Sequence, residues 1–319
     1  MTGEGHDAAP SAGWSSAGER GSTLALRFIV GCVRTIGPGP LVILLAPIAL
    51  YFVTFATEAR RASRSYLRRI RHVQGESGEP GLLAVYRHIY SFAAAILDRV
   101  ALWSSAIDRF DIEIHGREHM QPAIEAHTGA FLIGAHIGSF DVLRVIARDA
   151  DIPINVLMYS VHAERINQAF KELDPDSNVR IIDLDQTSVN TGIEIRRCIE
   201  RGEFVAVLAD RMLPSARNRV GYANFLGDQA AFPQGPFLLA SLLRLPVVLT
   251  IALRRGPRRY DIYLEPISDG APIGPKERPA AIQQQIELYA SRLEHYCLEA
   301  PLQWFNFYDF WAKADNERG

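Results

Sequence analysis

A histidine and an aspartate five positions apart, His136 and Asp141, are the residues of this sequence best suited to acid–base chemistry. They lie in the segment FLIGAHIGSFD, residues 131–141, where an apolar stretch ends at the histidine and a turn of small residues follows. On a continuous helix, five residues correspond to about 500° of rotation, so the two side chains would point apart. They can meet only if His136 lies in a turn and Asp141 in the first turn of a helix. The spacing therefore predicts a strand, a turn and a helix in which Asp141 orients His136.

Such a pair suits general-base catalysis. A carboxylate that accepts a hydrogen bond from one imidazole nitrogen leaves the other nitrogen free to remove a proton from a substrate hydroxyl. This chemistry requires no metal and no cofactor. Ser139, in the same turn, is the alternative nucleophile, but GSFD lacks the GxSxG elbow of serine hydrolases. A serine directly before a helix is more often an N-cap, so we expect Ser139 to cap the helix.

Other residues that bind metals are not arranged for it. His115, Glu118 and His119 have the H-x-x-E-H spacing of a zinc motif, but Gly116 and a preceding strand pattern argue against the helix that this motif needs.

The three cysteines form no CxxC pair, which indicates neither a zinc ribbon nor a disulfide framework and favours a reducing compartment. The net charge of -2 gives no general attraction to polyanions, so we expect no nucleic-acid partner.

The elements that must position these residues alternate between strands and helices. Seven short stretches have the composition of strands, and helical periodicity fills most of the intervals between them. The predicted strands are residues 110–115, 130–135, 154–159, 179–182, 204–209, 246–253 and 260–267, and the predicted helices are residues 82–110, 140–148, 163–173, 191–201, 234–243 and 279–298. This order predicts an α/β fold, with a mostly parallel central sheet of about seven strands flanked by helices and ligand groups beyond the strands' carboxyl ends. Only the last two strands are expected to form an antiparallel hairpin.

Asp210 and Arg211 end one of the predicted strands, so they face whatever occupies the crevice beyond the sheet. Arg211 is suited to bind a phosphate, a carbonyl or a developing oxyanion. A structural salt bridge between this pair and neighbouring loops is the equally supported alternative.

The N-terminal part has a different composition. Residues 1–22 are rich in Gly, Ser and Ala and predict a disordered tail. Residues 41–55 carry no charge, but they are fewer than the roughly 20 residues needed to span a bilayer. Residues 36–57 reach that length, but they include a Gly-Pro-Gly-Pro run. The choice between a spanning and a re-entrant segment stays open. Six arginines follow within residues 60–71, which predicts a cytoplasmic location for the next domain and suits contact with anionic lipid.

Four motifs together resemble one known family. The segment HIGSFD, between a predicted strand and helix, resembles the H-x4-D/E motif of the lysophospholipid acyltransferase superfamily, in particular its bacterial lipid A biosynthesis branch of lauroyl and myristoyl transferases. Upstream, GREHM at residues 116–120 resembles that branch's G-x-E-x-hydrophobic element. Downstream, Asp210 and Arg211 resemble its strand-ending D-R pair, and FLGDQAAFPQGPFLLA at residues 225–240 resembles its F-x-G and G-P-F stretch. The resemblance covers about residues 24–311, and the joint order of the motifs is specific where each alone is weak.

The resemblance implies transfer of a fatty acyl group from an acyl thioester, on acyl carrier protein or coenzyme A, to a hydroxyl of a membrane lipid or glycolipid. It implies two catalytic residues, His136 and Asp141, and four substrate-binding residues, Arg211, Asp210, Gly235 and Ser139. In the phospholipid branches the third motif reads F-P-E-G-T-R, whereas residues 232–237 here read FPQGPF. This departure argues against lysophosphatidate as the acceptor and favours a lipid A-like acceptor.

Composition and the resemblance together predict a domain organisation. Residues 1–22 would form the tail, residues 23–75 a membrane-associated segment, and residues 76–319 the acyltransferase domain on the cytoplasmic face of the cell inner membrane. Two alternatives stay open. A thioesterase or lipid hydrolase would use the same histidine with water in place of the alcohol. A non-enzymatic membrane adaptor would bind lipid through the apolar segment and the arginines.

Overall fold

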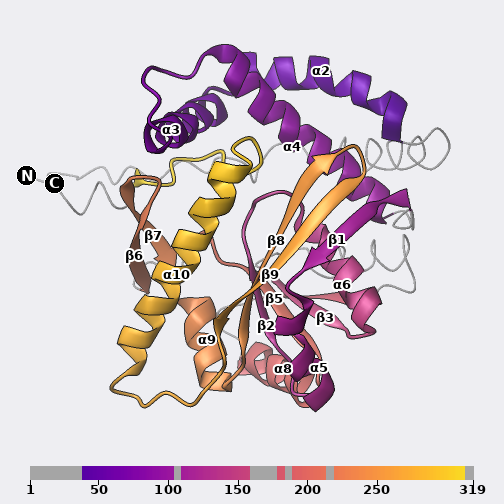
Figure 1. Ribbon diagram of the computed structural model, residues 1–319, viewed down its shortest axis with the longest axis vertical. Helices are drawn as coiled ribbons and strands as arrows, with labels where there is room; N and C mark the ends of the chain where they lie inside the picture. Colours follow the sequence, from indigo (N-terminus) through magenta and orange to yellow (C-terminus); the bar gives the residue numbers. More distant parts are fainter. Residues whose placement is uncertain (1–37, 104–108, 159–177, 184–188, 213–218, 313–319) are drawn as a thin grey trace, which may run out of the picture.

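The computed structural model of this chain describes residues 38–103, 109–158, 178–183, 189–212 and 219–312 (Figure 1). The predicted tail, the start of the apolar segment and the predicted helix at residues 163–173 lie outside this part of the chain. The described residues form a central sheet with helices on both of its faces, and three N-terminal helices pack at one end of it (Figure 1).

Seven strands form the central sheet, in the order β1-β9-β8-β2-β5-β3-β4. Their bounds are β1 Asp111–His115, β2 Phe131–Gly134, β3 Ile154–Met158, β4 Val179–Asp183, β5 Phe204–Leu208, β8 Val247–Gly256 and β9 Arg259–Ser268. Strands β8, β2, β5, β3 and β4 are parallel to one another, whereas β9 is antiparallel to β8 and β1 is parallel to β9. The predicted α/β class, the seven strands and the terminal hairpin are confirmed.

Helices connect the strands and cover the sheet (Figure 1). Their bounds are α5 Gln121–Ala126, α6 Leu143–Ala150, α8 Val189–Glu200, α9 Gly235–Leu243 and α10 Arg278–Glu299. The helix predicted at residues 140–148 begins later than expected, because Phe140–Val142 forms a 3-10 turn, η3, ahead of α6. The helices predicted at residues 191–201, 234–243 and 279–298 are confirmed as α8, α9 and α10.

The side chains of β2 alternate between two hydrophobic cores. Phe131 and Ile133 belong to the core that also contains Ile286 of α10. Leu132 belongs to the other core, with Ile146 of α6. Because both faces of the strand are covered, each of its residues is buried, and the sequence shows a continuous apolar run instead of alternation.

A second, two-stranded sheet was not predicted from the sequence. Strands β6 (Val220–Phe225) and β7 (Asp228–Pro233) pair antiparallel and are joined by Leu226 and Gly227, both with positive φ. The sequence signal was weak because Leu-Gly is not the Asn-Gly or Asp-Gly pair that marks such turns. Strand β6 packs against α10 and so extends the covering layer on that face.

In the described part of the chain, three helices precede the sheet. Their bounds are α2 Pro38–Phe55, α3 Thr57–Val73 and α4 Leu82–Trp103. Helix α2 packs along α4, and its residues Leu45, Ala49 and Val53, four positions apart, are buried. Among the described residues, no helix alone is long and apolar enough to cross a bilayer. The stretches Leu41–Phe55 and Thr57–Val73 meet that criterion only as a pair, and a bend of 94° separates them.

Candidate active site

His136 and Asp210 lie together at the carboxyl ends of two adjacent strands. Strands β2 and β5 are in parallel register, with Gly134 opposite Leu208, and the N–H of Ala209 donates to the Gly134 carbonyl at 2.9 Å. His136 and Asp210 each come two residues after these partners, so the register brings them side by side. From β2 the chain continues to β3, which lies beyond β5 in the sheet. From β5 the next strand of this sheet is β8, which lies on the opposite side, beyond β2. Such a reversal of strand order is where open α/β sheets bind ligands.

Asp210 binds His136 through two hydrogen bonds. Nδ1 of His136 donates to Oδ1 of Asp210 at 2.7 Å, and the backbone N–H of His136 donates to Oδ2 at 2.9 Å. A carboxylate can only accept, so this contact places the proton of the neutral ring on Nδ1. Nε2 has no hydrogen-bond partner in the described part of the chain. The His136 side chain is 26% exposed and that of Asp210 is 0% exposed, so the histidine is the member of the pair that a substrate can reach.

Asp210 is an anion despite its burial. Nε1 of Trp304 and Nδ2 of Asn306 also donate to Oδ2, at 3.0 and 2.9 Å. Burial alone would raise the pKa of this carboxyl, but the charge and hydrogen bonds of His136 and the charge of Arg211 outweigh burial and lower the pKa below its usual value. Asp210 can therefore orient His136 and stabilise the positive charge that forms when His136 accepts a proton.

A C-terminal segment, residues 303–306, closes over the turn that carries His136. The N–H of Phe305 donates to the His136 carbonyl at 2.7 Å, and Ile137 forms an antiparallel bridge with Trp304. Trp304 is fully buried. The rings packed around it are Tyr66, Phe225, Phe310 and Trp311. The dense aromatic residues of 303–311 predict a segment that packs over an acyl channel or lies at the lipid headgroups, but the sequence did not identify Trp304 and Asn306 as partners of Asp210.

Asp141 does not hold His136, and the predicted contact between them is corrected. The carboxylate of Asp141 accepts from Nε of Arg99, in α4, at 2.5 Å. Nδ1 of His136 is already bound by Asp210. The physical reason is the register of β2 and β5, which delivers a carboxylate directly to Nδ1, while the charge of Arg99 holds Asp141 against α4. Asp141 thus links the turn after β2 to the N-terminal helices.

Ser139 occupies the N-cap position of η3, but its hydroxyl makes no capping hydrogen bond. The side chain is buried, and Oγ has no hydrogen-bond partner among the described residues. The expected cap is therefore absent, and no described group activates this hydroxyl as a nucleophile.

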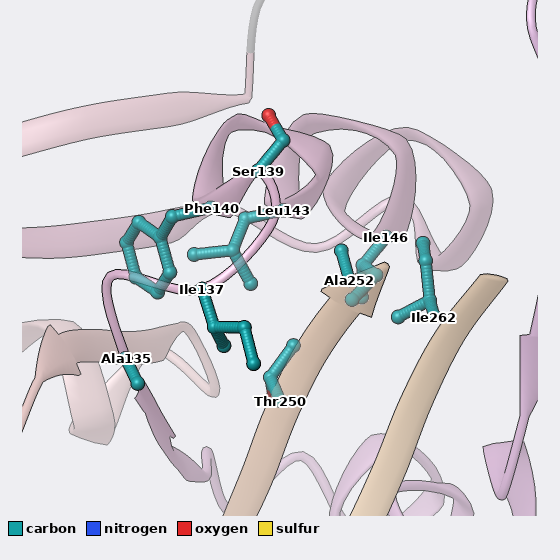
Figure 2. A pocket seen from close by; sticks show the side chains of 9 residues that line it. All are labelled: Ala135, Ile137, Ser139, Phe140, Leu143, Ile146, Thr250, Ala252 and Ile262. Carbon is teal, nitrogen blue, oxygen red and sulfur yellow. The ribbon is translucent and has the colours of Figure 1, made fainter. Parts of the chain in front are cut away.

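A cavity of about 10 Å³ lies beside the same turn. Its lining is mostly apolar, and Figure 2 shows the hydroxyl of Ser139 on the outer side of the turn, away from Ile137 and Thr250. This volume is about that needed for one water molecule and is far too small for a fatty acyl chain. Entry of an acyl chain here would require the lining side chains to move.

Arg211 lies exposed directly after Asp210. Its Nε donates to Oδ1 of Asn306 at 2.6 Å, and its Nη2 donates to the carbonyl of Phe305 at 3.0 Å. Among the described residues it forms no salt bridge, so the structural alternative raised by the sequence is not what holds it. The guanidinium is anchored to the C-terminal segment and keeps its charge available.

The other predicted substrate-binding residues differ in position. Asp210 is fully buried behind His136, so its predicted contact with substrate is corrected to an orienting contact with His136. Gly235 is exposed in the first turn of α9, with open space where a Cβ would lie. No described hydrogen bond joins Gly235 to His136 or Asp210, and its contact with substrate stays a prediction.

The H-x-x-E-H residues do not share a helix face. His115 ends β1, a left-handed Gly116 follows, and η2 (Arg117–His119) is only a 3-10 turn.

One other group of possible metal ligands occurs among the described residues. Glu113, His115 and Asp261 bring one ligand atom each within 4.8 Å of one another. Nε of Arg255 donates to Oδ2 of Asp261 at 2.6 Å. The arginine already balances one of the two carboxylates.

Comparison with known protein families gives a match. The sequence matches the family described as bacterial lipid A biosynthesis acyltransferase over residues 44–313, a range that contains both sheets and the His136–Asp210 site. A comparison with curated proteins found no match. The family match covers most of the chain. The chain therefore belongs to the bacterial lipid A biosynthesis acyltransferase family.

Proposed function

We propose that this acyltransferase moves a fatty acyl group from an acyl thioester to a hydroxyl of a lipid A-like glycolipid, with His136 as general base and Asp210 as its orienting partner. The observation that carries the proposal is the pair itself. Nδ1 of His136 is bound by a buried carboxylate, and Nε2 has no partner among the described residues. The family match supports acyl transfer and a lipid A-like acceptor.

In the first step, Nε2 of His136 removes the proton of the acceptor hydroxyl while the hydroxyl oxygen forms a bond to the thioester carbonyl carbon. Asp210 stabilises the imidazolium that results. The former carbonyl oxygen now carries a negative charge, and the exposed guanidinium of Arg211, anchored beside the site, is suited to stabilise it.

In the second step, the tetrahedral intermediate re-forms the carbonyl and breaks the carbon–sulfur bond. The departing thiolate takes the proton from Nε2, so the products are an ester and a free thiol, and His136 is neutral again. The thiol belongs to acyl carrier protein or to coenzyme A. None of these steps requires a metal ion.

We further propose that α2 and α3 seat the enzyme on the cytoplasmic face of the inner membrane. One stripe of α2 packs along α4, and its other sides expose large apolar side chains, among them Ile43, Leu44, Leu50, Tyr51 and Phe55. Helix α3 exposes arginines suited to anionic headgroups, Arg61, Arg64 and Arg68. Because α4 covers one stripe of α2, a position within the interface suits this helix better than a free span.

The test is acyl transfer by the purified full-length protein from radiolabelled acyl carrier protein thioester to membrane lipid that contains lipid A precursors. Substitution His136→Ala should lower ester formation by about 10² to 10⁴-fold, the usual contribution of a general base. His119→Ala, which removes an exposed histidine in η2, is the matched control and should leave transfer unchanged.

Undiminished transfer by a folded His136→Ala protein would overturn the proposal. Release of free fatty acid without labelled lipid would instead indicate the hydrolase alternative. Absence of any acyl turnover by the unsubstituted protein would indicate the adaptor.

A further inference from the structure

His88 and Ser63 form a buried hydrogen-bonded pair that the catalytic steps above do not use. His88 lies in α4 and Ser63 in α3, and both are 0% exposed. Nδ1 of His88 is 2.9 Å from Oγ of Ser63, and Nε2 is 2.9 Å from the carbonyl oxygen of Trp304. The complete burial of both side chains excludes direct contact with substrate.

The partners of His88 determine its tautomer. A carbonyl oxygen can only accept a hydrogen bond, so Nε2 must carry the proton that is donated to Trp304. Nδ1 is then the acceptor, and the Ser63 hydroxyl donates to it. Burial lowers the pKa of His88 to about 4, although its hydrogen bond to Trp304 acts in the opposite direction. The ring is therefore neutral near pH 7 and donates a hydrogen bond only from Nε2.

The peptide group that accepts this hydrogen bond also binds the active site. Its oxygen belongs to Trp304 and accepts from His88, while its N–H belongs to Phe305 and donates to the His136 carbonyl at 2.7 Å. The indole of Trp304 donates to Oδ2 of Asp210 at 3.0 Å. One peptide plane thus stands between His88 and the catalytic histidine, and its tryptophan also reaches the orienting carboxylate.

Aromatic packing restricts the His88 ring. The ring centroids of Tyr66 and Phe307 lie 5.4 and 4.8 Å from that of His88, and the ring of Phe305 stacks at 6.2 Å. A ring held in this way presents Nε2 to the peptide at a fixed angle. The packing also links the N-terminal helices α3 and α4 to the segment that covers the site.

We propose that His88 is a positioning residue for acyl transfer, acting through the Trp304–Phe305 peptide to hold the C-terminal segment in the geometry that aligns His136 with Asp210. The proposal rests on the proposed catalytic function of His136. It assigns no contact with substrate to His88, and it predicts an effect on turnover in place of an effect on substrate binding.

Two amide substitutions test the proposal with matched chemistry. The amide nitrogen of a glutamine reaches about the position of Nε2 and can donate to Trp304, whereas that of an asparagine reaches only about the position of Nδ1. His88→Gln should therefore keep kcat per folded molecule within about threefold of the unsubstituted protein. His88→Asn should lower kcat by about ten- to a hundredfold with KM for the acyl donor nearly unchanged, as expected for a small displacement of catalytic groups. The folded fraction is measured by circular dichroism under the assay conditions.

Equal kcat values for the two folded variants would overturn the positioning role, because a purely structural residue should not distinguish the position of the donor. If His88→Asn does not fold, the ¹⁵N chemical shifts of the imidazole in the unsubstituted protein decide. The proposal requires the proton on Nε2 at pH 7, and a proton on Nδ1 would overturn it. His136→Ala separates the two claims, since retained activity in that variant refutes the proposed function whatever the His88 variants do.

Discussion

Nδ1 of His136 lies 2.7 Å from Oδ1 of Asp210, although 74 positions separate the two residues in the sequence. The acid that orients the histidine comes from the neighbouring strand β5 and not from the helix that follows β2. This origin gives the acid a rigid support, because its strand is hydrogen-bonded to the strand that carries the histidine. The C-terminal segment adds two further donors to the same carboxylate. Residues from three distant parts of the chain thus meet at one carboxylate, that of Asp210.

Gly138 should tolerate no side chain. Its φ is +60°, and a Cβ at this position would collide with the carbonyl oxygen of Ala252, in β8. We expect Gly138→Ala to lower the free energy of unfolding by about 3 kcal/mol or more and to reduce transfer, because strain in this turn displaces His136. Gly192→Ala is the control, since the helix α8 leaves open space there. Chemical unfolding of both variants checks this, and equal stabilities would contradict it.

The buried His88 should make stability depend on pH. Its pKa is about 4 in the folded protein and about 6.5 when exposed. Between these values the unfolded chain binds a proton that the folded protein excludes, so unfolding becomes more favourable as pH falls. This stabilising contribution is fully present above about pH 6.5 and is lost as pH falls toward 4, by about 3 kcal/mol in total.

The titratable ring described in contact with His88 is that of Tyr66, whose pKa burial raises, so it stays neutral across this range. His88→Gln should therefore show a smaller loss of stability than the unsubstituted protein between pH 7 and pH 5. Unfolding midpoints of His88→Gln and of the unsubstituted protein, measured in one detergent at pH 7 and pH 5, give the comparison. Parallel losses in the two proteins would refute a titrating His88.

The exposed apolar side of α2 should control binding to vesicles. Leu44 is 55% exposed, and Leu44→Glu should lower partition onto phosphatidylethanolamine–phosphatidylglycerol vesicles by about tenfold or more, because one leucine contributes about 1.5 to 3 kcal/mol when buried in an apolar phase. Leu242 is also 55% exposed and belongs to α9, a helix that lies away from α2 (Figure 1). Leu242→Glu should not change partition. Cosedimentation with vesicles measures the partition of both variants. Equal effects of the two substitutions would contradict membrane binding through α2.

Local sequence patterns were sufficient for the class of fold. Continuous apolar runs such as residues 131–134 indicate strands covered on both faces, and the helical intervals between them indicate parallel connections. The position of His136 after such a run was enough to place it at the carboxyl edge of the sheet. The β6–β7 pair was missed because Leu226 and Gly227 do not have the residue types typical of hairpin turns.

The partner of His136 could not be obtained in the same way. Spacing relates His136 to Asp141, but it does not reveal that β5 lies beside β2 while β3 and β4 lie beyond it. One signal was present, because Asp210 follows its apolar strand as His136 follows its own. To use that signal requires the order of the strands, which depends on packing between distant segments. The roles of Trp304 and Asn306 depend on the same long-range packing.

The most direct test of the central claim compares kcat for acyl transfer in Asp210→Asn and Asp141→Asn, both purified as full-length, folded proteins. If Asp210 orients His136, its replacement by asparagine should lower kcat by about 10³ to 10⁴-fold, because an amide no longer fixes the tautomer or stabilises the imidazolium. Replacement of Asp141 should lower kcat by no more than about tenfold, since its described ion pair is with Arg99 and Nδ1 of His136 is held by Asp210. A larger loss with Asp141→Asn than with Asp210→Asn would contradict the assignment.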